Sequence, residues 1–178
     1  ILKVGCQFLT DASTIIKDAD VEAIAVVTPA STHYSLVKEA LLAKKHVFCE
    51  KPMTLDVREG EELCALAETS GVKFMVGYTF LYNNGVRYLK KIGRSKSLGK
   101  LYYMTSTRTH MGLIREDVDA AWDLASHDIS IMNYILDETP VAVSSIGANP
   151  LGNKHHDVAF ITLHYKNDII GQIHVSWV

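Results

Sequence analysis

Three side chains have the types and surroundings that acid–base chemistry requires: Lys51, Asp123 and His127. Lys51 lies between Glu50 and Pro52, directly after a short apolar run. Pro52 restricts its own backbone and that of the residue before it, so the lysine is held in a defined conformation. A partly desolvated ammonium in such a place can stabilise negative charge on an oxygen atom. A solvated loop lysine is the alternative interpretation.

Asp123 and His127 occur in the stretch WDLASHD, four residues apart. On a helix this spacing puts both side chains on one face. A carboxylate beside an imidazole orients the ring and raises its basicity, which suits a general base near neutral pH. The alternatives are a helix pair without a catalytic role, or a capping aspartate and a core histidine. Asp128, the next residue, is expected at the surface or as a partner between domains.

The elements that must position these residues alternate in the first half of the chain. Short apolar runs at 22–28, 46–50 and 72–77 are typical of strands buried on both faces of a parallel sheet. In such a sheet ligands bind beyond the carboxyl ends of the strands, and these ends should share one edge. The three ends are Thr28-Pro29-Ala30, Glu50-Lys51-Pro52 and Gly77-Tyr78-Thr79.

Helical patterns separate these runs, which gives the order of right-handed βαβ units. Ser31 or Thr32 is predicted to cap a helix that extends to about residue 45. Asp56 is predicted to cap a second helix, and Gly71 to end it. Two earlier elements are also predicted, a strand near 3–9 and a helix over 11–19.

The second half has a different pattern. Helices are predicted over 86–92 and 121–136, and strands over 100–109, 141–146, 158–165 and 169–178, the last two joined as a hairpin by Lys166-Asn167-Asp168. These elements indicate an α+β domain with an open, mainly antiparallel sheet. We therefore predict an α/β chain of two domains, 1–77 and 78–178.

Composition excludes several classes of protein. With 18 basic and 20 acidic side chains, the net charge of −2 does not indicate binding to nucleic acid. No run reaches the roughly 18 apolar residues needed to cross a bilayer, so no membrane association is expected. Three widely spaced cysteines predict buried, reduced thiols and a cytoplasmic location. Adjacent His155 and His156 lack further ligands at usable spacing, so no metal site is predicted.

The chain resembles the glucose–fructose oxidoreductase / inositol dehydrogenase / MocA family. The resemblance rests on AVVTPASTHYSLVKEALLAKKHVFCEKPMTL at 25–55, VGYTFLYNNGVRYLKK at 76–91 and AAWDLASHDISI at 120–131. It implies a Rossmann dinucleotide-binding domain, of which residues 1–77 are the C-terminal half, and a nicotinamide cofactor, NAD or NADP. It also implies oxidation or reduction of a sugar or cyclitol carbinol, and a homo-oligomer, dimeric or tetrameric.

The resemblance also assigns roles to individual residues. Lys51, Asp123 and His127 match the catalytic lysine and Asp/His pair of the family, and the Lys51–Pro52 bond is expected to be cis. Which of Lys51 and His127 is the base stays open. The predicted cofactor-binding residues are Thr28, Pro29, Ala30, His33, Glu50, Lys51 and Pro52. Residue type and position, and not the resemblance, predict Tyr78, Asn83, Arg108, Arg115 and Trp122 as substrate-binding residues. The two arginines are equally well explained as solvated groups, and Trp122 as a core residue or a ligand wall.

Within the family, residues 77–91 and 122–130 are similar to the UDP-N-acetylglucosamine 3-dehydrogenase branch. This similarity predicts oxidation of a UDP-N-acetyl-hexosamine at C3. The alternatives are an inositol or other free-sugar dehydrogenase, and a catalytically silent regulator that senses a nucleotide or sugar. The family's GxGxxG motif is absent from this sequence, so we expect the residues to be an internal piece of a longer protein.

Overall fold

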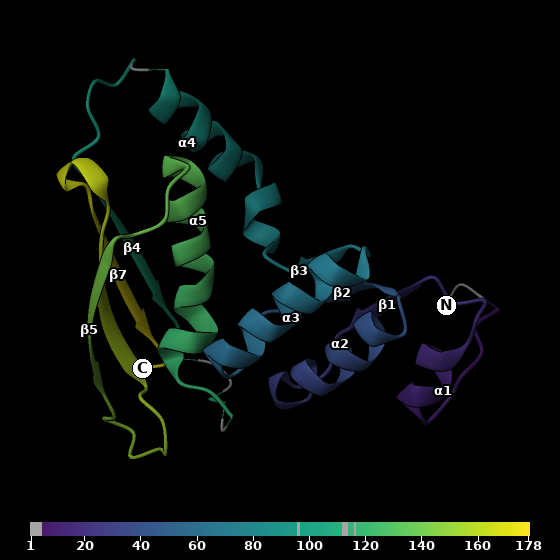
Figure 1. Cartoon of the computed structure of the whole chain (residues 1–178). Helices are drawn as coiled ribbons and strands as arrows, with labels where there is room; N and C mark the ends of the chain where they lie inside the picture. The colour runs from purple at the N-terminus through teal and green to yellow at the C-terminus, as the bar shows by residue number, and fades with distance from the viewer. Residues whose placement is uncertain (1–4, 96, 112–113, 116) are drawn as a thin grey trace. The chain divides into compact units, whose positions relative to one another are not determined.

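Residues 1–77 and 78–178 form two units in the computed structural model (Figure 1). The structure describes residues 5–95, 97–111, 114–115 and 117–178. Each unit has its own hydrophobic core.

A three-stranded parallel sheet of order β1-β2-β3 organises the first unit. This confirms the predicted parallel arrangement, and the three carboxyl ends therefore lie along one edge. The face with Val26 and Val47 packs against helices to form the core, but Ala23, Ala25 and Met75 on the other face are exposed. The prediction of burial on both faces is thus wrong for this chain. The strands are β1 (Ala23–Val26), β2 (His46–Cys49) and β3 (Phe74–Val76).

Three helices accompany this sheet: α1 (Ala12–Lys17), α2 (His33–Leu42) and α3 (Val57–Ser70). Asp56 caps α3 by accepting from Arg58 N at 2.7 Å, and Gly71 ends it with a positive φ of 72°. Thr32 is the N-cap residue of α2, as one of the two predicted alternatives. Its hydroxyl makes no capping hydrogen bond but donates to Pro29 O, and a 3₁₀ turn η1 (Ala30–Thr32) precedes the helix. No strand occurs over residues 5–9, and residues 3–4 of the predicted first strand lie outside the described residues.

The second unit is a four-stranded sheet of order β4-β7-β6-β5, with helix α5 over one face (Figure 1). β4 pairs with β7 in parallel, whereas the other two pairs are antiparallel, so the sheet is mixed. Buried side chains of β6 and β7, such as Ile161 and Ile173, pack with Met132 of α5. The strands are β4 (Tyr103–Thr109), β5 (Ala142–Ala148), β6 (Val158–His164) and β7 (Ile170–Ser176).

The helices of this unit contain Asp123 and His127, the predicted Asp/His pair. A 3₁₀ turn η2 (Thr79–Tyr82) leads into α4 (Asn84–Arg94), and a π-helical turn η3 (Ala121–Ala125) leads into α5 (Ser126–Leu136). The predicted single helix over 121–136 is therefore two helical types in series. Such π turns occur often at functional sites, and this one contains Asp123. A 3₁₀ turn η4 (Lys166–Asp168) joins β6 to β7.

Candidate active site

His33 links the ends of β1 and β2. Its ring is only 1% exposed, with Nδ1 2.7 Å from Pro52 O and Nε2 2.9 Å from Thr28 O. A neutral imidazole has one N–H, so both contacts are hydrogen bonds only when the ring carries two protons. Both ring nitrogens thus face backbone carbonyls of the protein itself, and His33 connects the loops that follow β1 and β2.

Glu50 and Lys51 leave β2 at the same edge. Lys51 N donates to Glu50 Oε2 at 3.2 Å, and both side chains are half-buried. The Lys51–Pro52 bond is cis, as the family resemblance predicted. The lysine is therefore only partly in solvent, as a group that stabilises negative charge on oxygen requires.

In the second unit, Asp123 is 9% exposed within the π turn, and His127 follows on α5. Arg115 forms a bidentate pair with Asp117, through Nε at 2.9 Å and Nη2 at 2.7 Å, and its Nη1 lies 3.7 Å from Asp123 Oδ1. Hydrogen bonding from Arg115 lowers the pKa of the Asp117 carboxyl. The Arg115 guanidinium is thus engaged with carboxylates of its own unit.

Aromatic rings surround His127. The Phe80 ring lies 4.9 Å from the imidazole at 72°, and the Tyr78 ring lies 6.5 Å away at 86°. Both are edge-to-face arrangements, which aromatic pairs prefer. Burial raises the pKa of the Tyr78 hydroxyl, so this group stays protonated over the ordinary pH range. The imidazole is half-buried and its ring plane is restricted.

Asp128 is buried, which corrects the expectation of a surface or interdomain residue. It is 3% exposed and pairs with Arg108 of β4, Nε to Oδ2 at 2.9 Å and Nη2 to Oδ1 at 3.1 Å. The physical reason is the position of Asp128 on the face of α5 that packs on the sheet. Arg108, predicted to bind substrate, is thereby paired with a carboxylate inside the unit.

The other predicted substrate residues have different surroundings. Asn83 is exposed and caps α4, because its Oδ1 accepts from Gly85 N at 2.8 Å. Trp122 is 40% exposed within η3. Their roles toward substrate stay predictions.

Sequence reasoning did not identify Phe80, Ser106 or Asp117. One signal was available for Ser106: it stands two residues before Arg108 on one face of β4, facing the acid that follows His127. Phe80 had no comparable signal, because an aromatic residue after a strand is compatible with core packing.

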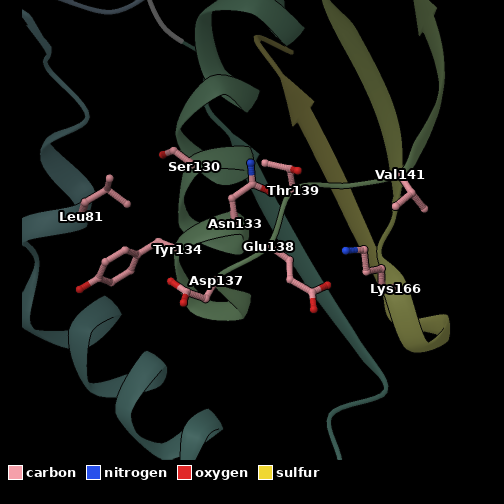
Figure 2. A pocket seen from close by; sticks show the side chains of 9 residues that line it. All are labelled: Leu81, Ser130, Asn133, Tyr134, Asp137, Glu138, Thr139, Val141 and Lys166. Atoms are coloured by element: carbon pink, nitrogen blue, oxygen red, sulfur yellow. The ribbon is translucent and has the colours of Figure 1, made fainter.

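A cavity of about 690 Å³ opens along α5 beyond His127 (Figure 2). Ser130 and Tyr134 line it, and both fall on the face of α5 that contains His127, by three- and seven-residue spacing. The Glu138 and Lys166 side chains also extend toward it. None of the predicted substrate residues lines this cavity; its remaining lining residues are Leu81, Asn133, Asp137, Thr139 and Val141.

Two negative findings concern the described residues. Among them, no group of three histidine, cysteine or acidic side chains is arranged to hold a metal ion. Their helices also include none with the length and apolar character needed to cross a membrane.

Two family models together match nearly the whole chain. Residues 2–78 match an oxidoreductase family with an NAD-binding Rossmann fold, and residues 86–178 match the GFO/IDH/MocA C-terminal domain. The chain belongs to the GFO/IDH/MocA oxidoreductase family. Its first unit is accordingly part of a Rossmann domain, as the sequence motifs predicted.

Members of the GFO/IDH/MocA family with different substrates are similarly close to this chain. The UDP-N-acetylglucosamine 3-dehydrogenase of Acidithiobacillus ferrooxidans is 28% identical, over 89% of this chain and 49% of its own. The myo-inositol 2-dehydrogenase of Thermotoga maritima is 26% identical, over 92% and 52%. A probable dehydrogenase structure from Thermotoga maritima superposes with a TM-score of 0.85, at 25% identity over 94% of this chain and 54% of that one. The chain thus spans about half the length of the curated relatives it matches.

The edge of the first sheet can be compared with the requirements of NAD. The exposed Thr28 hydroxyl, 2.7 Å from that of Thr32, and the half-buried Glu50 carboxylate provide partners for ribose hydroxyls. A Cβ at Gly77 would lie 3.1 Å from Glu50 Oε2, so a larger side chain here would have to displace the Glu50 side chain. These features fit the nicotinamide riboside half of NAD. The pyrophosphate is held in Rossmann domains by a GxGxxG turn, which this sequence lacks.

We expect Cys49, the last residue of β2, to resist alkylation. Burial, followed by the charge of Glu50, raises the pKa of the Cys49 thiol to about 12. At pH 8 the reactive thiolate is therefore only about one part in ten thousand, and this fraction grows only as the pH rises toward 12. Mass spectrometry of iodoacetamide-treated protein should show Cys6 and Cys64, which are exposed, modified first. Modification of Cys49 as fast as Cys64 would contradict the burial of this strand end.

Proposed function

We propose that this chain belongs to an NAD-dependent oxidoreductase, with NADP as the alternative cofactor, that moves a hydride to or from a sugar carbinol. The observation that carries the proposal is His127, a half-buried imidazole one helical turn after buried Asp123 and packed against Phe80. The family models support the same class of reaction.

Oxidation of a carbinol to a ketone removes one hydride and one proton. A bound nicotinamide ring supplies the hydride acceptor. In our proposal His127 accepts the hydroxyl proton, Asp123 stabilises the resulting imidazolium, and Lys51 stabilises negative charge on the oxygen. The reverse assignment, with Lys51 as base and His127 as donor, uses the same residues.

For the substrate we propose a UDP-N-acetyl-hexosamine oxidised at C3. This proposal is supported by the similarity of residues 77–91 and 122–130 to that branch and by the UDP-N-acetylglucosamine 3-dehydrogenase relative. One observation favours a neutral sugar or cyclitol instead: Arg108 and Arg115, the cations expected to hold a diphosphate, are each paired with an aspartate.

We further propose the cytoplasm as the compartment. All three cysteines are free thiols, although only Cys49 is buried as predicted, and free thiols persist in reducing compartments.

We also propose that the enzyme is a homo-oligomer that associates through the sheet face opposite α5. That face exposes two cross-strand pairs of large apolar side chains, Tyr103 with Ile170 (67% and 41% exposed) and Ile146 with Phe160 (71% and 45% exposed). Large exposed apolar groups on one face are typical of protein interfaces. Their burial against a second copy would remove them from water.

A charged side chain on this sheet face should therefore shift the association equilibrium of the enzyme toward monomers. We expect Phe160→Lys to reduce the mass measured by analytical ultracentrifugation of the full-length natural chain. Val57→Lys, at an exposed position on α3, is the matched control and should leave the mass unchanged. A monomeric unsubstituted enzyme, or an unchanged mass for Phe160→Lys, would count against this interface.

Removing either proton-handling side chain should depress turnover of the full-length chain while the fold persists. A group of this kind contributes about 10²–10⁴-fold, so we expect His127→Ala and Lys51→Ala each to lower kcat at least tenfold. Lys91→Ala, at an exposed position on α4, is the control for loss of a lysine. The readouts are reduced-nicotinamide absorbance and thermal unfolding. Full turnover in both variants would refute the assignment.

A substrate panel separates the two substrate classes. With NAD, we expect UDP-N-acetylglucosamine to generate reduced nicotinamide faster than myo-inositol, glucose or N-acetylglucosamine at equal concentration. Faster reduction by a free sugar or cyclitol would replace the nucleotide-sugar proposal with the neutral-substrate one. Tight binding of NAD and sugar without any absorbance change would instead indicate a silent regulator.

A further inference from the structure

The buried carboxylate of Asp128 joins α5 to β4 immediately after His127. Besides the two bonds from Arg108, its Oδ1 accepts from Ser106 Oγ at 2.7 Å. Arginine presents a rigid planar fork to a carboxylate. The plane of the Arg108 guanidinium is therefore fixed by its pairing with Asp128.

The same guanidinium lies against an aromatic ring. Its central carbon is 4.7 Å from the centre of the Phe80 ring, within the range of a cation–π interaction. Phe80 in turn packs edge-to-face against His127 at 4.9 Å. Four side chains from β4, η2 and α5 thus form one contact series, in the order Asp128, Arg108, Phe80, His127.

We infer that Asp128, Arg108 and Phe80 are positioning residues that set the orientation of the His127 imidazole. The inference rests on the proposed function, which gives His127 its role in proton transfer. The last torsion of a histidine side chain is broad, so the ring packed against the imidazole restricts where its nitrogens point. Small errors in the placement of a reacting group cost about 10²-fold in rate, which gives this packing a catalytic consequence.

A merely structural ion pair makes a different prediction. If Arg108 and Asp128 only attach α5 to β4, then Arg108→Lys, which leaves the Phe80 ring in the chain, should not affect His127. In the positioning account Phe80→Leu removes the ring that restrains the imidazole. Arg108→Lys keeps the positive charge but loses the planar, bidentate contact, so it should release Phe80 and His127 together.

The test uses the full-length natural chain with ¹³C-labelled histidine, the His127 signal being assigned from His127→Asn. We expect the ring signal of His127 to shift in Phe80→Leu and in Arg108→Lys. It should stay in place in Phe80→Tyr, which keeps the ring. Arg94→Lys is the matched control, because Arg94 of α4 forms an exposed ion pair with Asp137 at 2.7 Å. This variant should leave the His127 signal unchanged.

Kinetics of the same variants give a second readout. We expect kcat to fall at least tenfold in Phe80→Leu and Arg108→Lys, with KM changed less than twofold and cooperative thermal unfolding retained. An unmoved His127 signal in Arg108→Lys, or full kcat in both variants, would overturn the positioning role. Absence of turnover in the unsubstituted enzyme would refute the proposed function, whereas the NMR series would still decide whether Phe80 and Arg108 orient His127.

Discussion

A buried carboxylate needs partners, and the second unit depends on how Asp128 meets this requirement. An unpaired charge at a position only 3% exposed would cost several kcal/mol. Asp128 accepts three hydrogen bonds from Ser106 and Arg108, both on β4. The register of α5 on the sheet is thereby fixed at the residue after His127. The ion pair is thus best understood as a geometric constraint, since breaking a buried pair is costly even where the pair itself adds little stability.

In the first unit the buried polar side chain that needs partners is His33, and backbone carbonyls provide them. The buried His33 ring contacts Thr28 O and Pro52 O, one from each of two neighbouring strand ends. A parallel sheet brings its strand ends to one edge, but it does not by itself fix the loops that follow. His33 supplies that connection. Both ring nitrogens are thus engaged with the protein itself, and the cofactor contact that the family resemblance implies for His33 stays a prediction.

The parts predictable from sequence were those with a local cause. Helix α3 begins after Asp56 and ends at Gly71, as predicted, because an N-cap and a glycine in the left-handed conformation act on backbone groups only a few residues away. The strands of both sheets follow from their apolar patterns. The Thr32 hydroxyl makes no capping hydrogen bond because it donates to Pro29 O. The burial of Asp128 was not predicted because it depends on Arg108 of β4, twenty residues away. The contact between Phe80 and His127 is also nonlocal and has no sequence signature.

Direct transfer of a hydride from a sugar carbon is the central claim, and isotope labelling tests it most directly. The measurement is mass spectrometry of the reduced cofactor after the full-length enzyme has reacted with a UDP-N-acetyl-hexosamine deuterated at C3. Our account predicts that the label appears in the nicotinamide ring, and that His127→Ala slows this transfer. Reduced cofactor without deuterium, or label lost to water while the cofactor stays oxidised, would contradict it.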